Sequence, residues 1–332
     1  MAATLKRLIR RKEALYLLIT IVIVAGFTAN NKNFIGIDNL RGVMQAMAIT
    51  GIMSVAVTCT LIGGGIDLSM TAISLLGGVL CAIFIREGIA WPIAVVLALL
   101  CGAALGGVNA FMIAKLGMMP FIASIGLGQV LTGFRQAITN IQNVNVTVES
   151  FWWGSKNLFG FIPVPFVISI VLLVGYGVML SRTQMGRNIY LVGGNPNAAR
   201  LAGLNPTKIR SLLCVNSGVI GALSGIVLAS RMRLAMANSL QDSQMPAITA
   251  SILGGVAFGG GSGGMVGTFI GIMMLNFFST GMYSLAPEAY WTTISTGVLL
   301  IVALIMDFFL EKSRRRALMR RAVAAGKEGS DK

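Results

Sequence analysis

The residue types of this chain restrict the chemistry that it can perform. Histidine is absent from the 332 residues, which excludes histidine bases, Ser-His-Asp and Cys-His nucleophile systems and histidine metal sites. The four cysteines lie in apolar runs without a CxxC pair and are interpreted as small buried hydrophobic residues. Two Gly-Gly-Gly runs, at 63–65 and 259–261, lack the Gly-Lys-Ser/Thr of an ATP-binding P-loop, and we attribute their similarity to composition. We therefore expect no catalytic residue, metal site or cofactor in this chain.

A polar, basic loop at 181–211 has the residue spacing of ordered helices. Asn195 and Asn205 are each followed by proline, which is the arrangement of a capping residue before the first helical turn. Gly203 suits the left-handed residue that ends a helix. The spacing predicts a short helix at about 196–202 and a second helix that continues into an apolar run. The short helix is either a compact connection or a rigid docking element for a cytoplasmic partner.

Polar residues near or within the apolar runs are candidates for contact with a transported solute. Asp67 is nearly the only acid close to the predicted inner membrane boundary, where an unpaired charge is costly. It is either a structural cap for the helix that follows or a solute contact. The neutral residues either bond to neighbouring helices or line a path for an uncharged, hydroxyl-rich solute. The candidates for this path are Gln45, Asp67, Asn109, Gln129, Asn216 and Asn276.

The elements that must position these residues are membrane spans. The chain is 55% hydrophobic and 11% charged, whereas soluble domains carry about 25% charged residues. A helix crosses the hydrocarbon with about 20 apolar residues. Ten spans are predicted, at 14–29, 42–62, 70–85, 91–114, 120–140, 163–180, 212–230, 247–258, 265–282 and 291–309.

The net charge of +15 is concentrated in three segments that flank apolar runs, namely 1–13, 181–211 and 310–332. Under the positive-inside rule all three are cytoplasmic. Both termini then lie on one side, which requires an even number of crossings and opposes merging the eighth and ninth spans. This placement of the charge favours acidic membrane lipid over nucleic acid as a partner. We predict an all-α polytopic membrane protein with a cytoplasmic N-terminus, a transmembrane domain at 14–309 and a cytoplasmic tail.

Glycine accounts for 41 residues and recurs every four positions in several spans. Helices in lipid associate through close backbone packing at such small residues. The repeats therefore predict tight packing, either within one chain or at an interface between two chains. They are Gly102 and Gly106, Gly221 and Gly225, and Gly263, Gly267 and Gly271.

Three stretches carry a resemblance to a known family. They are GGGIDLSMTAI at 63–73, GRNIYLVGGNPNAARLAGLNPTKIR at 186–210 and MPAITASILGGVAFGGGSGGMVGT at 245–268. In this order and spacing they resemble the permease subunit of bacterial sugar-type ABC importers, the family of the ribose, galactoside and autoinducer-2 permeases. The middle stretch is quite specific, and the glycine-rich stretches are less so by themselves.

The resemblance implies a type II ABC importer fold with ten helices in the bacterial inner membrane. Two such chains, identical or paralogous, would form the pore. ATPase domains on separate polypeptides would bind ATP and Mg²⁺ and dock on the cytoplasmic loops, and a periplasmic protein would deliver the sugar. The loop helix at 196–202 would couple the ATPase to the pore. The coupling residues carried over are Gly186, Arg187, Gly193, Gly194, Asn195, Pro196, Ala198, Ala199, Arg200 and Gly203.

Two departures from the family pattern concern the solute. Met70-Thr71-Ala72 stand where the family often has Val-Gly-Ser. The usual Glu-Leu-Asp-Ala-Ile-Ala before the eighth span is replaced at 243–248, a change similar to the autoinducer-2 branch. The resemblance therefore does not indicate which sugar is carried. The alternative function is an ion- or proton-coupled secondary transporter, whereas a membrane enzyme would need a nucleophile and base that the chain lacks.

Overall fold

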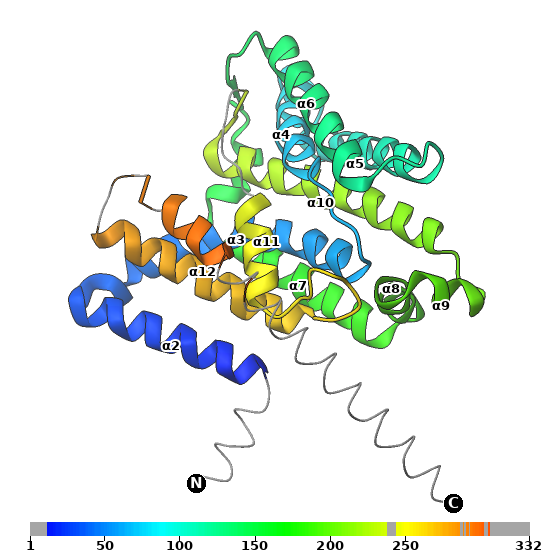
Figure 1. Ribbon diagram of the computed structural model, residues 1–332. Helices are drawn as coiled ribbons and strands as arrows, with labels where there is room; N and C mark the ends of the chain where they lie inside the picture. Colours follow the sequence, from blue (N-terminus) through cyan, green and yellow to red (C-terminus); the bar gives the residue numbers. More distant parts are fainter. Residues whose placement is uncertain are drawn as a thin grey trace, which may run out of the picture.

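The computed structural model describes residues 12–237 and 244–285, and the positions 288, 290, 291, 293–301 and 305. Its regular structure is almost wholly helical (Figure 1). The longer helices are α2 (Lys12–Asn30), α3 (Ile37–Ile62), α4 (Met70–Arg86), α5 (Trp91–Ala114), α6 (Pro120–Thr139), α7 (Val164–Arg182), α10 (Pro206–Met232) and α12 (Met265–Leu285). The shorter ones are η1 (Lys32–Ile35), η2 (Glu149–Ser155), α8 (Gln184–Gly194), α9 (Pro196–Leu201) and α11 (Gln244–Leu253).

The few strands form two short antiparallel pairs. β1 (Val144–Asn145) pairs with β4 (Leu234–Ala235), and β2 (Asn157–Leu158) pairs with β3 (Ile162–Pro163). Both pairs lie in segments that follow or precede long apolar helices. They pair segments that connect the helices, and the fold remains all-α.

Apart from the eighth, the predicted spans coincide with helices where the chain is described. Residues 290, 291 and 293–301 are helical where the tenth span was predicted. Within the described residues, five helices are long and apolar enough to cross a membrane, and two shorter apolar helices accompany them. The all-α polytopic class is thereby confirmed. The number of crossings and the side of each terminus stay predictions, because 1–11 and 306–332 lie outside the described residues.

α3 and α10 form the centre of the bundle. In the most apolar stretch of each helix, 83% of α3 and 67% of α10 is buried inside the structure. The corresponding shares for α5 and α7 are 33% and 22%. Apolar side chains of α5 and α7 therefore face outward, as expected for helices in contact with lipid.

The glycine repeats serve packing within the chain. A Cβ atom on Gly102 or Gly106 would collide with the backbone of α10, and one on Gly225 would collide with the backbone of α4. Similarly, Gly267 and Gly271 lie against α11 and the turn after it. Of the two predicted uses of these repeats, the structure supports close approach of helices in one chain.

α11 corrects the prediction of an eighth span at 247–258. This helix has ten residues, which at 1.5 Å per residue is about 15 Å, half of the hydrocarbon thickness. Ser54 Oγ donates to the carbonyl of Ala247 at 3.3 Å, and Thr58 Oγ1 donates to Ser251 Oγ at 3.1 Å. α11 therefore runs beside the last third of α3, and an irregular segment, 254–264, follows it. Such a segment is tolerated at membrane depth where protein surrounds it.

The connector between α3 and α4, residues 63–69, turns back into the bundle. A Cβ atom on Gly128 would lie 3.8 Å from both the Leu68 carbonyl oxygen and Ser69 Cα. Gly128 is eight residues beyond the start of α6, or about 12 Å along the helix. Asp67 thus lies near the middle of the bundle rather than at the predicted inner boundary.

The predicted topology can be tested in a variant without the four native cysteines. Asn157→Cys and Asn197→Cys introduce thiols at exposed positions on opposite sides of the predicted membrane. An impermeant maleimide should label the first in intact cells and the second only after permeabilisation. Labelling of both in intact cells would contradict the ten-span topology.

Candidate functional site

The loop at 181–211 contains two short helices, α8 and α9, which lie side by side at one end of the bundle near the start of α10 (Figure 1). The predicted caps are present. Asn195 Oδ1 accepts from the amides of Asn197 and Ala198 at 3.0 Å, and Asn205 Oδ1 accepts from that of Lys208 at 3.0 Å. Gly203 has φ +80°. The predicted helix at 196–202 is confirmed, and it ends at Leu201.

α8 was missed in the sequence, although its start carries a cap. Thr183 Oγ1 accepts from the amide of Gly186 at 3.2 Å, which is the same type of N-cap hydrogen bond that Asn195 makes for α9. Gly186 has no room for a Cβ atom, because the carbonyls of α7 lie against it. This close approach fixes α8 directly on the end of α7.

The two helices have an exposed face and a buried face. Arg187, Ala198 and Arg200 are exposed, and the Leu201 side chain is 92% exposed. Ala199, by contrast, is 3% exposed and belongs to the main hydrophobic core. The sequence-based assignment of Ala199 to the docking surface is therefore wrong, because its methyl group faces the chain itself. Leu201 is the most exposed large apolar residue of the two helices.

α8 ends where three glycine-containing backbone segments meet, which we call the glycine junction (Gly64, Gly193, Gly260 and Gly261). The amide of Gly261 donates to the carbonyl of Ile62 at 2.8 Å. A Cβ atom on Gly260 would lie 2.8 Å from the Gly193 carbonyl oxygen, and one on Gly193 would collide with the Ile62 carbonyl. The two Gly-Gly-Gly runs therefore contact each other and α8, rather than reflecting composition alone. The junction joins α8 to the end of α3 and to the segment after α11.

A side chain strengthens this connection. Tyr190 of α8 donates its hydroxyl hydrogen to the Gly263 carbonyl at 2.8 Å. The tyrosine hydroxyl is protonated at neutral pH, and burial raises the pKa of Tyr190 further, so it remains a donor. α8 is thus joined to residues 260–263 through both backbone and side-chain contacts.

Asp67 anchors a buried polar network beside the junction. Its Oδ1 accepts from the Ser69 amide at 3.0 Å, from Ser69 Oγ at 2.6 Å and from Asn109 Nδ2 at 3.1 Å. The Asp67 backbone carbonyl accepts from the side-chain Nε2 of Gln244, and Gln244 Oε1 accepts from Thr71 Oγ1 at 3.1 Å. The network therefore ties the connector to α5 and to the first residue of α11. Two helices, α4 and α11, begin here, and their N-terminal dipoles favour a nearby carboxylate.

The structural interpretation of Asp67 holds in a modified form. α4 begins at Met70 with Ser69 as its N-cap residue, so Asp67 does not occupy the cap position. It instead forms a turn in which its carboxylate binds the amide two residues ahead. Asp67 Oδ2 and Asn109 Oδ1 are buried and accept no hydrogen bond from the described part of the chain.

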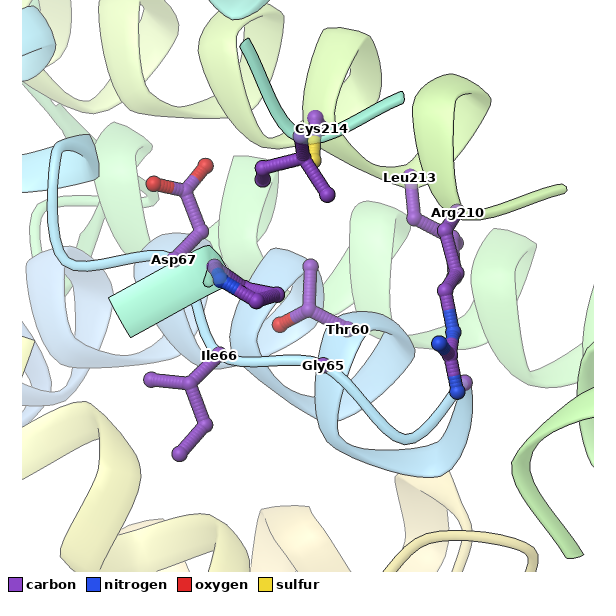
Figure 2. Close-up of a pocket in the computed structure, with 10 residues that line it drawn as sticks. Thr60, Gly65, Ile66, Asp67, Arg210, Leu213 and Cys214 are labelled. Carbon is purple, nitrogen blue, oxygen red and sulfur yellow. The ribbon is translucent and has the colours of Figure 1, made fainter. Parts of the chain in front are cut away.

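A small cavity separates Asp67 from the start of α10. Its volume is about 20 Å³, room for roughly one water molecule. Figure 2 shows the Asp67 carboxylate and the Arg210 side chain on opposite sides of this cavity, with Thr60 and Cys214 between them. Arg210 belongs to the first turns of α10, directly after α9, so the cavity lies between the start of α10 and the Asp67 network.

The six residues predicted to line a path do not converge within one chain. Asp67 and Asn109 are in contact. Gln45 accepts from Arg231 at 3.2 Å, Asn276 donates to its own helix at 2.8 Å, and Asn216 accepts from the Tyr176 hydroxyl. Gln129 is exposed on α6. Most of these groups bond to neighbouring helices, and their role in a path stays a prediction.

Comparison with known proteins identifies the family of this chain. The family described as "Branched-chain amino acid transport system / permease component" matches residues 39–304. The chain belongs to this permease family. The permease is 32% identical over 305 residues to the ribose import permease protein RbsC of Escherichia coli K12, covering 90% of this chain and 94% of the relative. The predicted resemblance to permeases of sugar-type ABC importers is confirmed.

Two further relatives are named for other sugars. The L-arabinose transport system permease protein AraH of Escherichia coli K12 is 31% identical over 284 residues, covering 85% of the permease and 86% of AraH. The fructose import permease protein FrcC of Rhizobium meliloti is 29% identical over 307 residues, covering 90% and 85%. No solved structure matches the chain significantly. These three relatives cover between 85% and 90% of the permease.

The Asp67 network predicts a stability effect. Asp67→Ala removes the acceptor of three donors, and each buried donor left unpaired costs about 1–3 kcal/mol. We expect the detergent-purified permease to melt several degrees lower, as measured by fluorescence-detected size exclusion after heating. Asp67→Asn retains a side-chain oxygen and should lose less. Equal melting temperatures for wild type and Asp67→Ala would contradict the network's role.

Proposed function

We propose that the permease is the pore-forming subunit of an ATP-driven importer for a sugar or sugar-like small polar solute. A binding protein would deliver the solute from the periplasm, and a separate ATPase subunit would supply the energy. Two permease chains would form the pore in the bacterial inner membrane. Relatives named as import permeases for ribose, arabinose and fructose support the solute class. The resemblance and the missing P-loop support the division of labour.

The observation that carries the mechanism is the glycine junction. The exposed face of α8 and α9 offers Arg187, Arg200 and Leu201 to the ATPase. When the ATPase moves these helices, the junction transmits the displacement through backbone contacts to the end of α3 and to the segment that follows α11. α11 spans only half of the bundle, so it can tilt without breaking a continuous transmembrane helix. Its first residue, Gln244, is bonded to the Asp67 network at mid-depth.

The opposite end of the bundle suits the delivery protein. The Arg233 guanidinium lies over the Trp152 ring, 4.5 Å from the ring centroid. The ring nitrogen of Trp152 donates a hydrogen bond to the Val146 carbonyl at 2.9 Å. The pairing of β1 with β4 links this segment to the end of α10. The resulting ordered surface is our candidate for contact with the solute-loaded binding protein.

Reconstitution separates this function from the ion- or proton-coupled alternative. Proteoliposomes that contain the permease, its ATPase and the binding protein should accumulate solute when ATP is supplied on the ATPase side. The purified permease alone should neither bind nor hydrolyse ATP. An ATPase subunit with its P-loop lysine replaced is the matched control. Uptake driven by a pH or sodium gradient without ATP would overturn the proposal in favour of a secondary transporter.

A further inference from the structure

A groove lies between α7 and α12, and of its lining residues only Tyr190 takes part in the proposed transport mechanism. On α7 it is lined by Val174, Gly177 and Val178, whose three- and four-residue spacing defines one face of the helix. Val266 and Phe269 line the α12 side. The groove has a volume of about 580 Å³, within the range of about 300–1,000 Å³ for ligand sites. It opens on the outward surface of α7, the least buried of the long apolar helices.

One end of this apolar groove is polar and positive. Ser181, Arg182 and Tyr190 line it where α7 ends and the cytoplasmic loop begins. Arg182 is exposed, and the loop at 181–211 contains five Lys/Arg and no acid. α12 also begins here, at Met265, so its N-terminal dipole adds positive potential. An apolar channel that ends at a cationic membrane surface matches an acyl chain attached to an anionic headgroup.

We propose that the groove between α7 and α12 binds an acyl chain of an anionic phospholipid, with the phosphate at Arg182. A second copy packed on this face about a two-fold axis would bring an identical basic loop against Arg182, which like-charge repulsion disfavours. Two rigid surfaces meeting over a hollow would also leave it unfilled and forfeit dispersion contacts. A free anion would have no use for the apolar lining. Because the lipid contacts Tyr190, it would stabilise α8 against α12.

Native mass spectrometry of the purified full-length permease tests this site. The protein is incubated with equal amounts of phosphatidylglycerol and phosphatidylcholine. We expect preferential retention of phosphatidylglycerol, which Arg182→Gln should weaken about fivefold, the contribution of one surface arginine. Val178→Trp fills the groove and should reduce binding of both lipids. The matched controls are Arg187→Gln and Val171→Trp, at exposed positions outside the lining.

Each remaining outcome overturns the proposal. Equal retention of both lipids by the wild type would show that the headgroup is not recognised. Unchanged binding in Arg182→Gln and Val178→Trp would show that the lipid lies elsewhere. A shift from dimer to monomer in Val178→Trp, with lipid binding intact, would assign the groove to a second chain. Displacement of phosphatidylglycerol by excess inorganic phosphate would indicate an anion site without an acyl chain.

Discussion

Leu201→Asp is expected to abolish co-purification of the ATPase subunit and solute uptake while leaving the amount of permease in the membrane unchanged. The Leu201 side chain is 92% exposed at the tip of α9, so it contributes almost nothing to the fold of the permease. In a packed contact it would contribute about 1.5–3 kcal/mol, and a buried, unpaired aspartate would add a penalty of several kcal/mol. Together these terms weaken docking by far more than tenfold. Affinity pull-down and uptake by the same cells measure both effects.

Ala199→Asp provides the contrast within the same helix. Ala199 is buried against the permease core, so the new charge would destabilise the permease itself. We expect low membrane abundance for Ala199→Asp and normal abundance for Leu201→Asp. If Leu201→Asp retained wild-type ATPase binding, α9 would not be the docking element.

Gly193→Ala is expected to lower the melting temperature of the permease and to reduce uptake at least tenfold. A methyl group at this position collides with the Ile62 carbonyl and lies 2.8 Å from the Gly261 amide nitrogen. All neighbouring atoms are backbone and cannot rotate away, so the three segments must separate. Overpacking of this kind costs about 1–3 kcal/mol, or roughly 2–10 °C in melting temperature. Thermal melting in detergent and cellular uptake measure the two effects.

The adjacent residue supplies the control. A Cβ atom on Gly194 would lie 3.9 Å from its nearest neighbour, Gly261 Cα, which is an ordinary contact. Alanine is also favoured over glycine in a helix by about 1 kcal/mol. Gly194→Ala should therefore be neutral or stabilising. Equal behaviour of the two variants would contradict the close approach at Gly193.

Much of the fold could be predicted because its signals are local. The apolar spans follow from composition along the chain, and the ends of α9 follow from the capping chemistry of Asn195 and Asn205. The face that Ala199 presents was not predictable, because it depends on how α9 lies against the rest of the chain. A six-residue helix has too few positions for hydrophobic periodicity to orient it.

The parts that could not be predicted are long-range. Nothing in the sequence indicates that the glycine runs at 63–65 and 259–261 meet, since they are almost 200 residues apart. The depth of Asp67 depends on the connector turning back into the bundle, which a glycine run permits but does not require. α11 was predicted as part of a full span because the apolar residues continue beyond the end of the helix at Leu253.

The ratio of ATP hydrolysed to solute imported tests the coupling role of the glycine junction most directly. It is measured in proteoliposomes that contain the permease, its ATPase and the binding protein. Because Gly193→Ala leaves the exposed face of α8 and α9 unchanged, the ATPase should remain docked and hydrolyse ATP, and the ratio should rise at least tenfold. Tyr190→Phe removes one hydrogen bond and should raise it about fivefold, the effect of roughly 1 kcal/mol. If Gly193→Ala and Tyr190→Phe both gave the same ratio as the wild type and Gly194→Ala, transmission through the junction would be contradicted.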